Sequence, residues 1–223
     1  MKKIGFYMMA AAIVLTTACK KEKDDPRQMI ISAKNLSRMQ FSMAGSGNAT
    51  IDWGDGTKIE KVMLADNKDW AGLTSYIPPQ FTFRHDYSGS SSYTITINGK
   101  ITHLWCSDFE MTNFNVSQNP ALEWFACFNN QLKSLDVKTN TALKYLYCYN
   151  NQLTSLDFSH NIALELIRCR DNQLTVKALN DLFATLVQNT DVKLQKRILI
   201  SGNPGTDDCD RSIAENKGWL VEP

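Results

Sequence analysis

The chain has 223 residues, of which 43% are hydrophobic and 21% are charged, with 24 Lys and Arg against 23 Asp and Glu. This composition is that of a globular protein and excludes a disordered, collagen-like or multi-span membrane chain. The net charge of +1 excludes a strongly basic nucleic-acid-binding protein. Six cysteines and three histidines exclude a dense disulfide scaffold and offer few metal ligands.

The N-terminus carries a signal for export. Lys2 and Lys3 precede an uncharged run over residues 4–18, which is too short to span a bilayer and predicts a signal peptide over 1–18. The segment 15–19, Leu-Thr-Thr-Ala-Cys, resembles the lipobox of bacterial lipoproteins. That resemblance implies cleavage before Cys19 and attachment of lipid, including palmitate, to this residue. A plain signal peptide followed by a chance cysteine is the alternative.

A charged run follows Cys19 and predicts a disordered tether over residues 19–27. Acidic residues at this place resemble the export signals of some Gram-negative surface lipoproteins. The resemblance implies a lipid-anchored protein of the outer membrane on the cell surface, with a periplasm-facing position as the alternative.

Residues 122–174 repeat one pattern at intervals of 21 residues. The segments 122–137, 143–158 and 164–174 align without gaps, and a weaker copy precedes them from residue 101. One cysteine column and two asparagine columns keep this spacing: Cys106, Cys127, Cys148 and Cys169; Asn130, Asn151 and Asn172; Asn119, Asn140 and Asn161. Each copy is too short to bury its own apolar side, so we expect the copies to stack around one core, with one parallel strand each.

The pattern L-x-x-L-x-C-x-x-N-x-L resembles the leucine-rich repeat. The resemblance covers about residues 101–203 and implies a short solenoid whose concave side is a parallel sheet. It also implies that Asn130, Asn151 and Asn172 form a structural ladder of hydrogen bonds to neighbouring turns. The second half of each copy, such as 132–137, is too short and too β-branched for a helix, so an extended chain or a 3₁₀ turn is expected there.

The fourth copy departs from the pattern. Residues 175–188 predict an amphipathic helix with an apolar side formed by Val176, Leu179, Leu182, Phe183 and Leu186. A last strand is predicted around residues 198–203. Residues 209–223 are expected to form a C-terminal cap, since an uncapped solenoid exposes its apolar core.

Residues 28–100 predict a separate β-rich domain, because apolar residues alternate and Gly and Ser mark turns. A strand over 49–57 enters a Gly-Asp-Gly turn, and strands over 83–87 and 93–97 flank a Gly/Ser turn. The W-G-D-G turn and the later H-x-Y before Y-x-I-x-I resemble the PKD-like, immunoglobulin-type β-sandwich. The loop at Tyr76, Pro78 and Pro79 departs from that family as an insertion or an irregular edge.

Three side chains of this region suggest chemistry at first sight. Asp52 and Asp55 could bind calcium, but the stretch offers fewer oxygen ligands than calcium takes, and Asp and Gly are ordinary turn residues. His85 is interpreted as a hydrogen-bonded turn residue in preference to a catalyst.

The four repeated cysteines point into the core, where a parallel column does not converge on zinc; we expect them to pack as free thiols. The redox state of Cys209 is left open.

The residues between the core positions of the repeats face outward, because side chains alternate along a strand. They are rich in Trp, Tyr and Phe, with two arginines at one end, and these types dominate protein interfaces. The predicted ligand-binding residues of the concave face are Trp105, Trp124, Phe128, Tyr145, Tyr147, Tyr149, Arg168 and Arg170. Aromatic stacking that only stabilises the sheet, or coverage by the N-terminal domain, is the alternative.

The sequence therefore predicts a mainly β protein, with an N-terminal β-sandwich and a leucine-rich repeat solenoid of 21-residue repeats carrying one helix near the C-terminus. The expected boundaries are 1–18, 19–27, 28–100 and 101–223. The resemblances imply a bacterial surface lipoprotein, and the aromatic concave face predicts that it binds a protein of host or bacterial surfaces. A glycan-binding module and a structural envelope protein are the alternatives. No catalytic motif is present, so we expect neither enzyme activity nor a cofactor, metal or nucleic-acid partner.

Overall fold

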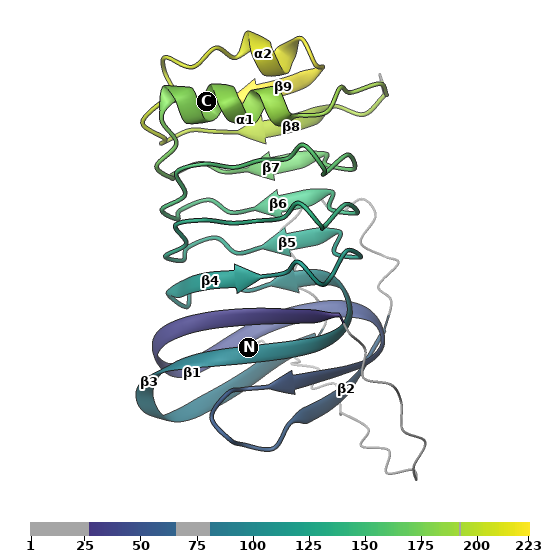
Figure 1. Ribbon diagram of the computed structural model, residues 1–223, viewed down its shortest axis with the longest axis vertical. Coiled ribbons are helices and arrows are strands. Elements are labelled where there is room, and N and C mark those ends of the chain that lie inside the picture. Colours follow the sequence, from purple (N-terminus) through teal and green to yellow (C-terminus); the bar gives the residue numbers. More distant parts are fainter. Residues whose placement is uncertain (1–26, 66–80, 192) are drawn as a thin grey trace, which may run out of the picture.

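The computed structural model describes residues 27–65, 81–191 and 193–223, and shows a mainly β protein built on one mixed, open sheet (Figure 1). The predicted signal peptide, Cys19, most of the predicted tether and the loop at residues 76–79 lie outside these ranges. Within them, no helix is both long enough and apolar enough to cross a membrane. The molecule is elongated, with the N-terminal strands at one end and two helices at the other.

The N-terminal part is formed by two long antiparallel strands, β1 (Gln28–Asp52) and β3 (Phe81–Trp105). Asn98 of β3 pairs with Gln28 at the start of β1 and with Thr50 near its end, so β1 bends around and flanks β3 on both sides. Two short strands complete this part: β2 (Glu60–Leu64) and β4 (Met111–Asn115) each pair with β1.

The two strands predicted around residues 83–87 and 93–97 are one strand in the structure. The Gly/Ser segment between them was expected to be a turn, and this expectation is wrong. β3 continues through it while its pairing with β1 shifts register between Ala33 and Arg38. The register shift marks a bulge, so the Gly/Ser segment lies at a bulge in the pairing and does not reverse the chain.

β3 also runs through residue 100, where the sequence predicts a boundary between two domains. Its last residues pair in parallel with β5, His103 opposite Trp124 and Trp105 opposite Ala126. The sheet is therefore continuous from the antiparallel part into the parallel part, in the order β2-β1-β3-β5-β6-β7-β8-β9.

The parallel part is a stack of short strands (Figure 1), of which the first three follow one another at 21 residues and the last two at longer intervals. These strands are β5 (Trp124–Ala126), β6 (Tyr145–Tyr147), β7 (Leu166–Arg168), β8 (Lys196–Leu199) and β9 (Trp219–Glu222). Each pairs in register with the next, so the strand of each 21-residue copy is confirmed. The predicted last strand is β8, and the cap region adds β9 beyond it.

The predicted amphipathic helix is α1 (Val176–Thr185), with Leu179, Leu182 and Phe183 buried. Thr175 caps its first turn by accepting from the backbone N–H of Ala178. A short second helix, α2 (Ser212–Glu215), follows at the same end of the molecule (Figure 1).

Asparagine side chains hold the turns of the stack at fixed spacing. The Asn151 amide donates to the backbone oxygens of Cys127, Cys148 and Tyr149 and accepts from the N–H of Leu132. Asn130 and Asn172 make the corresponding bonds one copy earlier and one copy later. Each amide thus ties two adjacent copies together, as the ladder interpretation predicts.

A further column of residues, not expected from the sequence, lies one position before the column of Asn130, Asn151 and Asn172. Asp108, Asn129, Asn150 and Asp171 have positive φ angles of 52–69°. The Asn150 amide donates to Asn129 Oδ1 over 2.9 Å, and Asn129 donates to Asp108 Oδ1 over 2.6 Å. Asn and Asp tolerate this left-handed conformation, which reverses the chain after each strand.

One apolar core runs the length of the described chain, from Met29 in β1 to Val221 in β9. It includes Trp53 and Phe41 at the N-terminal end and the leucines of every copy in the stack. Cys106, Cys127, Cys148 and Cys169 are fully buried free thiols within it. Burial raises the pKa of all four, that of Cys169 to about 12.

Candidate binding surface on the sheet

A second apolar cluster lies on the other side of the parallel strands from the core. We call it the aromatic face, and it consists of Trp105, Trp124, Ala126, Phe128, Tyr145, Tyr147, Tyr149 and Leu166. Strand alternation explains its position: Phe125, Leu146 and Ile167 point into the core, so the residues on either side of each point outward. The structure thus brings the predicted aromatic residues together.

The middle of the aromatic face is more tightly packed than the sequence suggests. Phe128, Tyr147 and Tyr149 retain only 5%, 9% and 8% of their exposure, whereas Trp105, Trp124 and Tyr145 are half-buried. Phe128 stacks on Tyr149 with ring centroids 4.4 Å apart, and Trp124 meets Tyr147 edge to face at 5.4 Å. These rings contact one another across strands, which stabilises the sheet whatever else the face does.

Tyr145 carries a polar tip at the edge of this cluster. Its hydroxyl donates to Glu165 Oε2 over 2.8 Å. Burial, together with this hydrogen bond and the nearby Glu165 charge, raises the pKa of Tyr145 to about 12. Tyr145 therefore stays neutral and fixed in orientation. Glu165 directly precedes β7 and was not identified from the sequence. The 21-residue spacing could have suggested it, because it places Glu165 one copy after Lys144, the neighbour of Tyr145.

Two arginines end the aromatic face. The guanidinium carbon of Arg168 lies 5.1 Å from the ring centre of Tyr147, and that of Arg170 lies 4.7 Å from the ring centre of Tyr149. Both contacts are of the cation–π type, which orients the side chains along the stack. The predicted order of aromatic residues followed by arginines is therefore present as a continuous column of contacts.

A cavity of about 340 Å³ adjoins the aromatic face at the first copy of the repeat. It is bordered by Gln40, Phe41, Ser42, Thr82, Trp105, Ser107, Asp108 and Phe109. The Trp105 indole N–H donates to Ser107 Oγ, which fixes the indole beside it. This cavity was not foreseen, because residues of β1 and β3 form part of its wall.

The residues considered for calcium or catalysis have other roles. Asp52 accepts from the N–H of Gly54, and Asp55 accepts from the N–H and the hydroxyl of Thr57. His85 Nε2 lies 2.7 Å from Asp55 Oδ2. In the described ranges, no group of three or more His, Cys, Asp and Glu side chains is arranged to hold a metal ion.

Comparisons with known proteins find few similarities. No protein-family model matches the chain, and no curated protein matches it. Among solved structures, it is similar to the functional domain of InlJ from Listeria monocytogenes, a domain described as including a cysteine ladder. The identity is 28% and the TM-score is 0.33, over 51% of this chain and 32% of that one. The match thus spans about a third of the length of InlJ's domain.

Proposed function

We propose that this chain is a non-catalytic surface lipoprotein that binds a protein ligand through its aromatic face. In this proposal the stacked copies are leucine-rich repeats, and the N-terminal strands are a PKD-like domain that closes one end of the solenoid. The repeat pattern supports the first assignment, and the Trp53-Gly-Asp-Gly turn with its His85 contact supports the second. The lipid anchor at Cys19 rests on the sequence alone.

The observation that carries the binding proposal is the existence of an apolar cluster outside the core. The core already accounts for the folding of the stack, since every copy buries its leucines and cysteine on the other side of the sheet. Trp105, Trp124 and Tyr145 add large aromatic surface that this core does not use. Tyr and Trp at half-buried positions are the side chains that most often dominate binding energy.

The packing divides the predicted residues into two groups. Phe128, Tyr147 and Tyr149 are buried already and support the surface from within. Trp105, Trp124, Tyr145, Arg168 and Arg170 are half-buried and would contact the ligand. Replacement of the first group would therefore disturb the fold, and only the second group gives a clean test of binding.

A glycan ligand is less well supported by this geometry. A sugar ring stacks on the flat side of an aromatic ring, and that side must not be covered by another side chain. Tyr149 has Phe128 of the preceding copy against one face, and Arg170 of the following copy lies over its ring. The central rings are thus used within the protein, while a protein ligand needs only their edges and the half-buried rim.

The experiment compares capture of surface-protein extracts by the full chain and by the variant W124A/Y145A. We expect the variant to show a cooperative thermal unfolding transition, as a folded protein does. We also expect its affinity for the captured ligand to fall by at least about 30-fold. The control variants I162A and M63A remove exposed apolar side chains elsewhere and should bind normally. Protease treatment of the extract should abolish capture. Equal capture by the folded double variant would overturn the proposal, and capture that survives protease would favour the glycan alternative.

A further inference from the structure

The two arginines of the aromatic face lack the carboxylate partners that a neighbouring arginine has. Arg197, one copy further along, is paired with Glu222. Among the described residues, no carboxylate forms an ion pair with Arg168, and Arg170 has only Asp171, with Nε to Oδ2 at 3.9 Å. The cationic ends of these two side chains are therefore not neutralised by an acid in good hydrogen-bonding contact.

Hydrogen bonding gives the same result. The Nε atoms of Arg168 and Arg170 are buried and have no acceptor in the described part of the chain. A buried donor without an acceptor destabilises the folded chain. The adjacent tyrosine rings hold both guanidinium groups in place without supplying an oxygen. The terminal nitrogens of both guanidinium groups stay within reach of a ligand, since only the Nε atoms are covered and both side chains are half-buried, and a carboxylate matches a guanidinium best.

We propose that Arg168 and Arg170 bind two carboxylates of an extended acidic segment in the protein ligand. This inference rests on the proposed function, because it names the chemistry of the partner at the same face. Arg168 ends β7 and Arg170 follows it by two residues on the same side of the sheet, so their stems are about 7 Å apart if the chain continues extended. Acidic residues at alternate positions of an extended peptide have the same spacing. The aromatic rim would hold apolar side chains of that peptide, which orients it along the face.

The test uses a library of random 12-residue peptides displayed on phage and selected on the purified full chain. We expect enrichment of peptides with two acidic residues at alternate positions beside an aromatic or aliphatic residue. Synthetic copies should then bind R168Q/R170Q at least about tenfold more weakly than the parent. They should also lose affinity for the parent as the salt concentration rises from 50 to 300 mM. R168K/R170K should recover only part of the affinity, since lysine lacks the planar fork of arginine.

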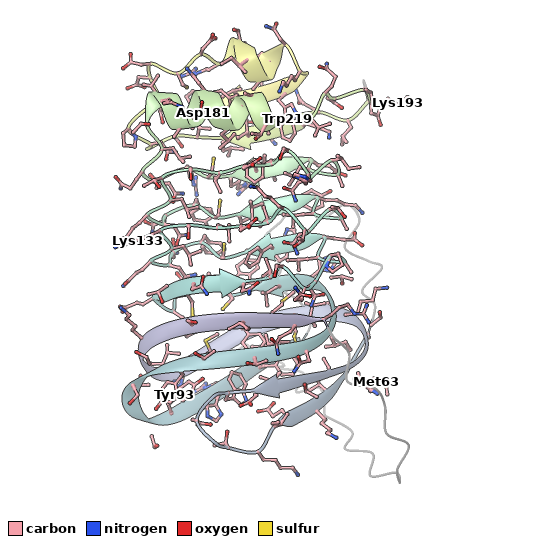
Figure 2. The ribbon with its side chains drawn as sticks, viewed as in Figure 1. Met63, Tyr93, Lys133, Asp181, Lys193 and Trp219 are labelled. Carbon is pink, nitrogen blue, oxygen red and sulfur yellow. The ribbon has the colours of Figure 1, made fainter. Side chains whose placement is uncertain are left out.

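A matched control removes two positive charges elsewhere. Lys133 and Lys177 are exposed and lie outside the aromatic face. Figure 2 shows Lys133 at one side of the stack, opposite to the side at which Lys193 lies. K133Q/K177Q has the same net charge as R168Q/R170Q and should bind the peptides as the parent does. Equal weakening by both double variants would mean that net charge, and not a site, governs binding, which would overturn the inference.

The two proposals fail in different ways. If peptides are enriched without acidic residues and are lost on W124A/Y145A but not on R168Q/R170Q, the aromatic face binds protein and the arginine inference is wrong. If no selected peptide depends on Trp124 or Tyr145, the proposed function itself is wrong. Heparin fragments test an anionic glycan as the partner. If the parent binds them, R168Q/R170Q does not, and both proteins bind the acidic peptides equally, the arginines recognise an anionic glycan and the inference is overturned.

Discussion

His85 Nε2 lies 2.7 Å from Asp55 Oδ2, thirty residues earlier in the chain. The imidazole also stacks on Trp53, with ring centroids 4.9 Å apart, and the Tyr87 hydroxyl donates to the Trp53 carbonyl oxygen. These contacts join the turn after β1 to the first part of β3. The Trp, Asp and His of two distant motifs therefore form one structural cluster.

This cluster predicts a loss of stability in acid. Its hydrogen bonds with Thr57 and His85 lower the pKa of Asp55 from an ordinary 3.8 to about 2. The folded state thus favours the charged form, so the stabilisation is complete above about pH 4 and is lost as the pH falls towards 2. We expect D55N to be less stable than the parent by about 1–2 kcal/mol at pH 7 and nearly equal to it at pH 2. Urea unfolding across this range measures the difference.

The control for this measurement is D207N, which changes an exposed carboxylate elsewhere. It should leave the acid dependence of unfolding as it is in the parent. If D55N kept the same stability deficit at pH 2 as at pH 7, the loss would come from altered packing of the turn, and the role of the Asp55 charge would be refuted.

The asparagine ladder predicts a large effect from one amide. N151A removes a buried donor of three hydrogen bonds and the acceptor for Leu132 N–H, which leaves backbone groups of two copies without partners. We expect a loss of about 3 kcal/mol in the free energy of unfolding, measured by urea denaturation. Q152A, at the exposed neighbouring residue, should change stability by less than about 0.5 kcal/mol. A loss under about 1 kcal/mol in N151A would contradict the ladder's role.

The buried cysteines predict an order of chemical modification. Burial raises the pKa of all five described cysteines, but Cys209 is only half-buried, whereas Cys106, Cys127, Cys148 and Cys169 are fully buried. Thiol reagents attack the thiolate, so iodoacetamide at pH 8 should label Cys209 first and the other four only on unfolding. Mass spectrometry of the digested protein measures each site. Labelling of Cys127 at the rate of Cys209 in folded protein would show that the stack opens.

The repeat made the stack predictable, because three columns of residues at one spacing fix both the strand and its inward side. Phe125 and Cys127 identify the core side of the strand, so the alternating residues Trp124 and Phe128 lie on the other side. What the sequence could not supply is the contact between copies. Phe128 is buried because Tyr149 stacks on it from the next strand, and a single copy contains no sign of that.

The N-terminal part was harder to predict, for a different physical reason. Its pairings join residues far apart, such as Gln28 with Asn98, and the same Asn98 pairs again with Thr50. Local turn residues at 88–92 suggested a reversal, but tertiary pairing on both sides of β3 kept the strand continuous. The sequence does not reveal the column of residues with positive φ angles. The leucine-rich repeat pattern marks only the second asparagine of each Asn-Asn pair, whereas the first ones, Asn129 and Asn150, also have a conformational role.

Every junction between β5, β6 and β7 is the same in-register pairing, held by equivalent asparagines. A further 21-residue copy inserted between residues 137 and 143 would meet the same partners on both sides, and neither end of the molecule would have to change. The length of the aromatic face is therefore a discrete property, which grows or shrinks by one strand spacing of about 4.8 Å for each copy. Gain or loss of whole copies would let a lineage alter the reach of this protein for the proposed ligand without redesigning its core.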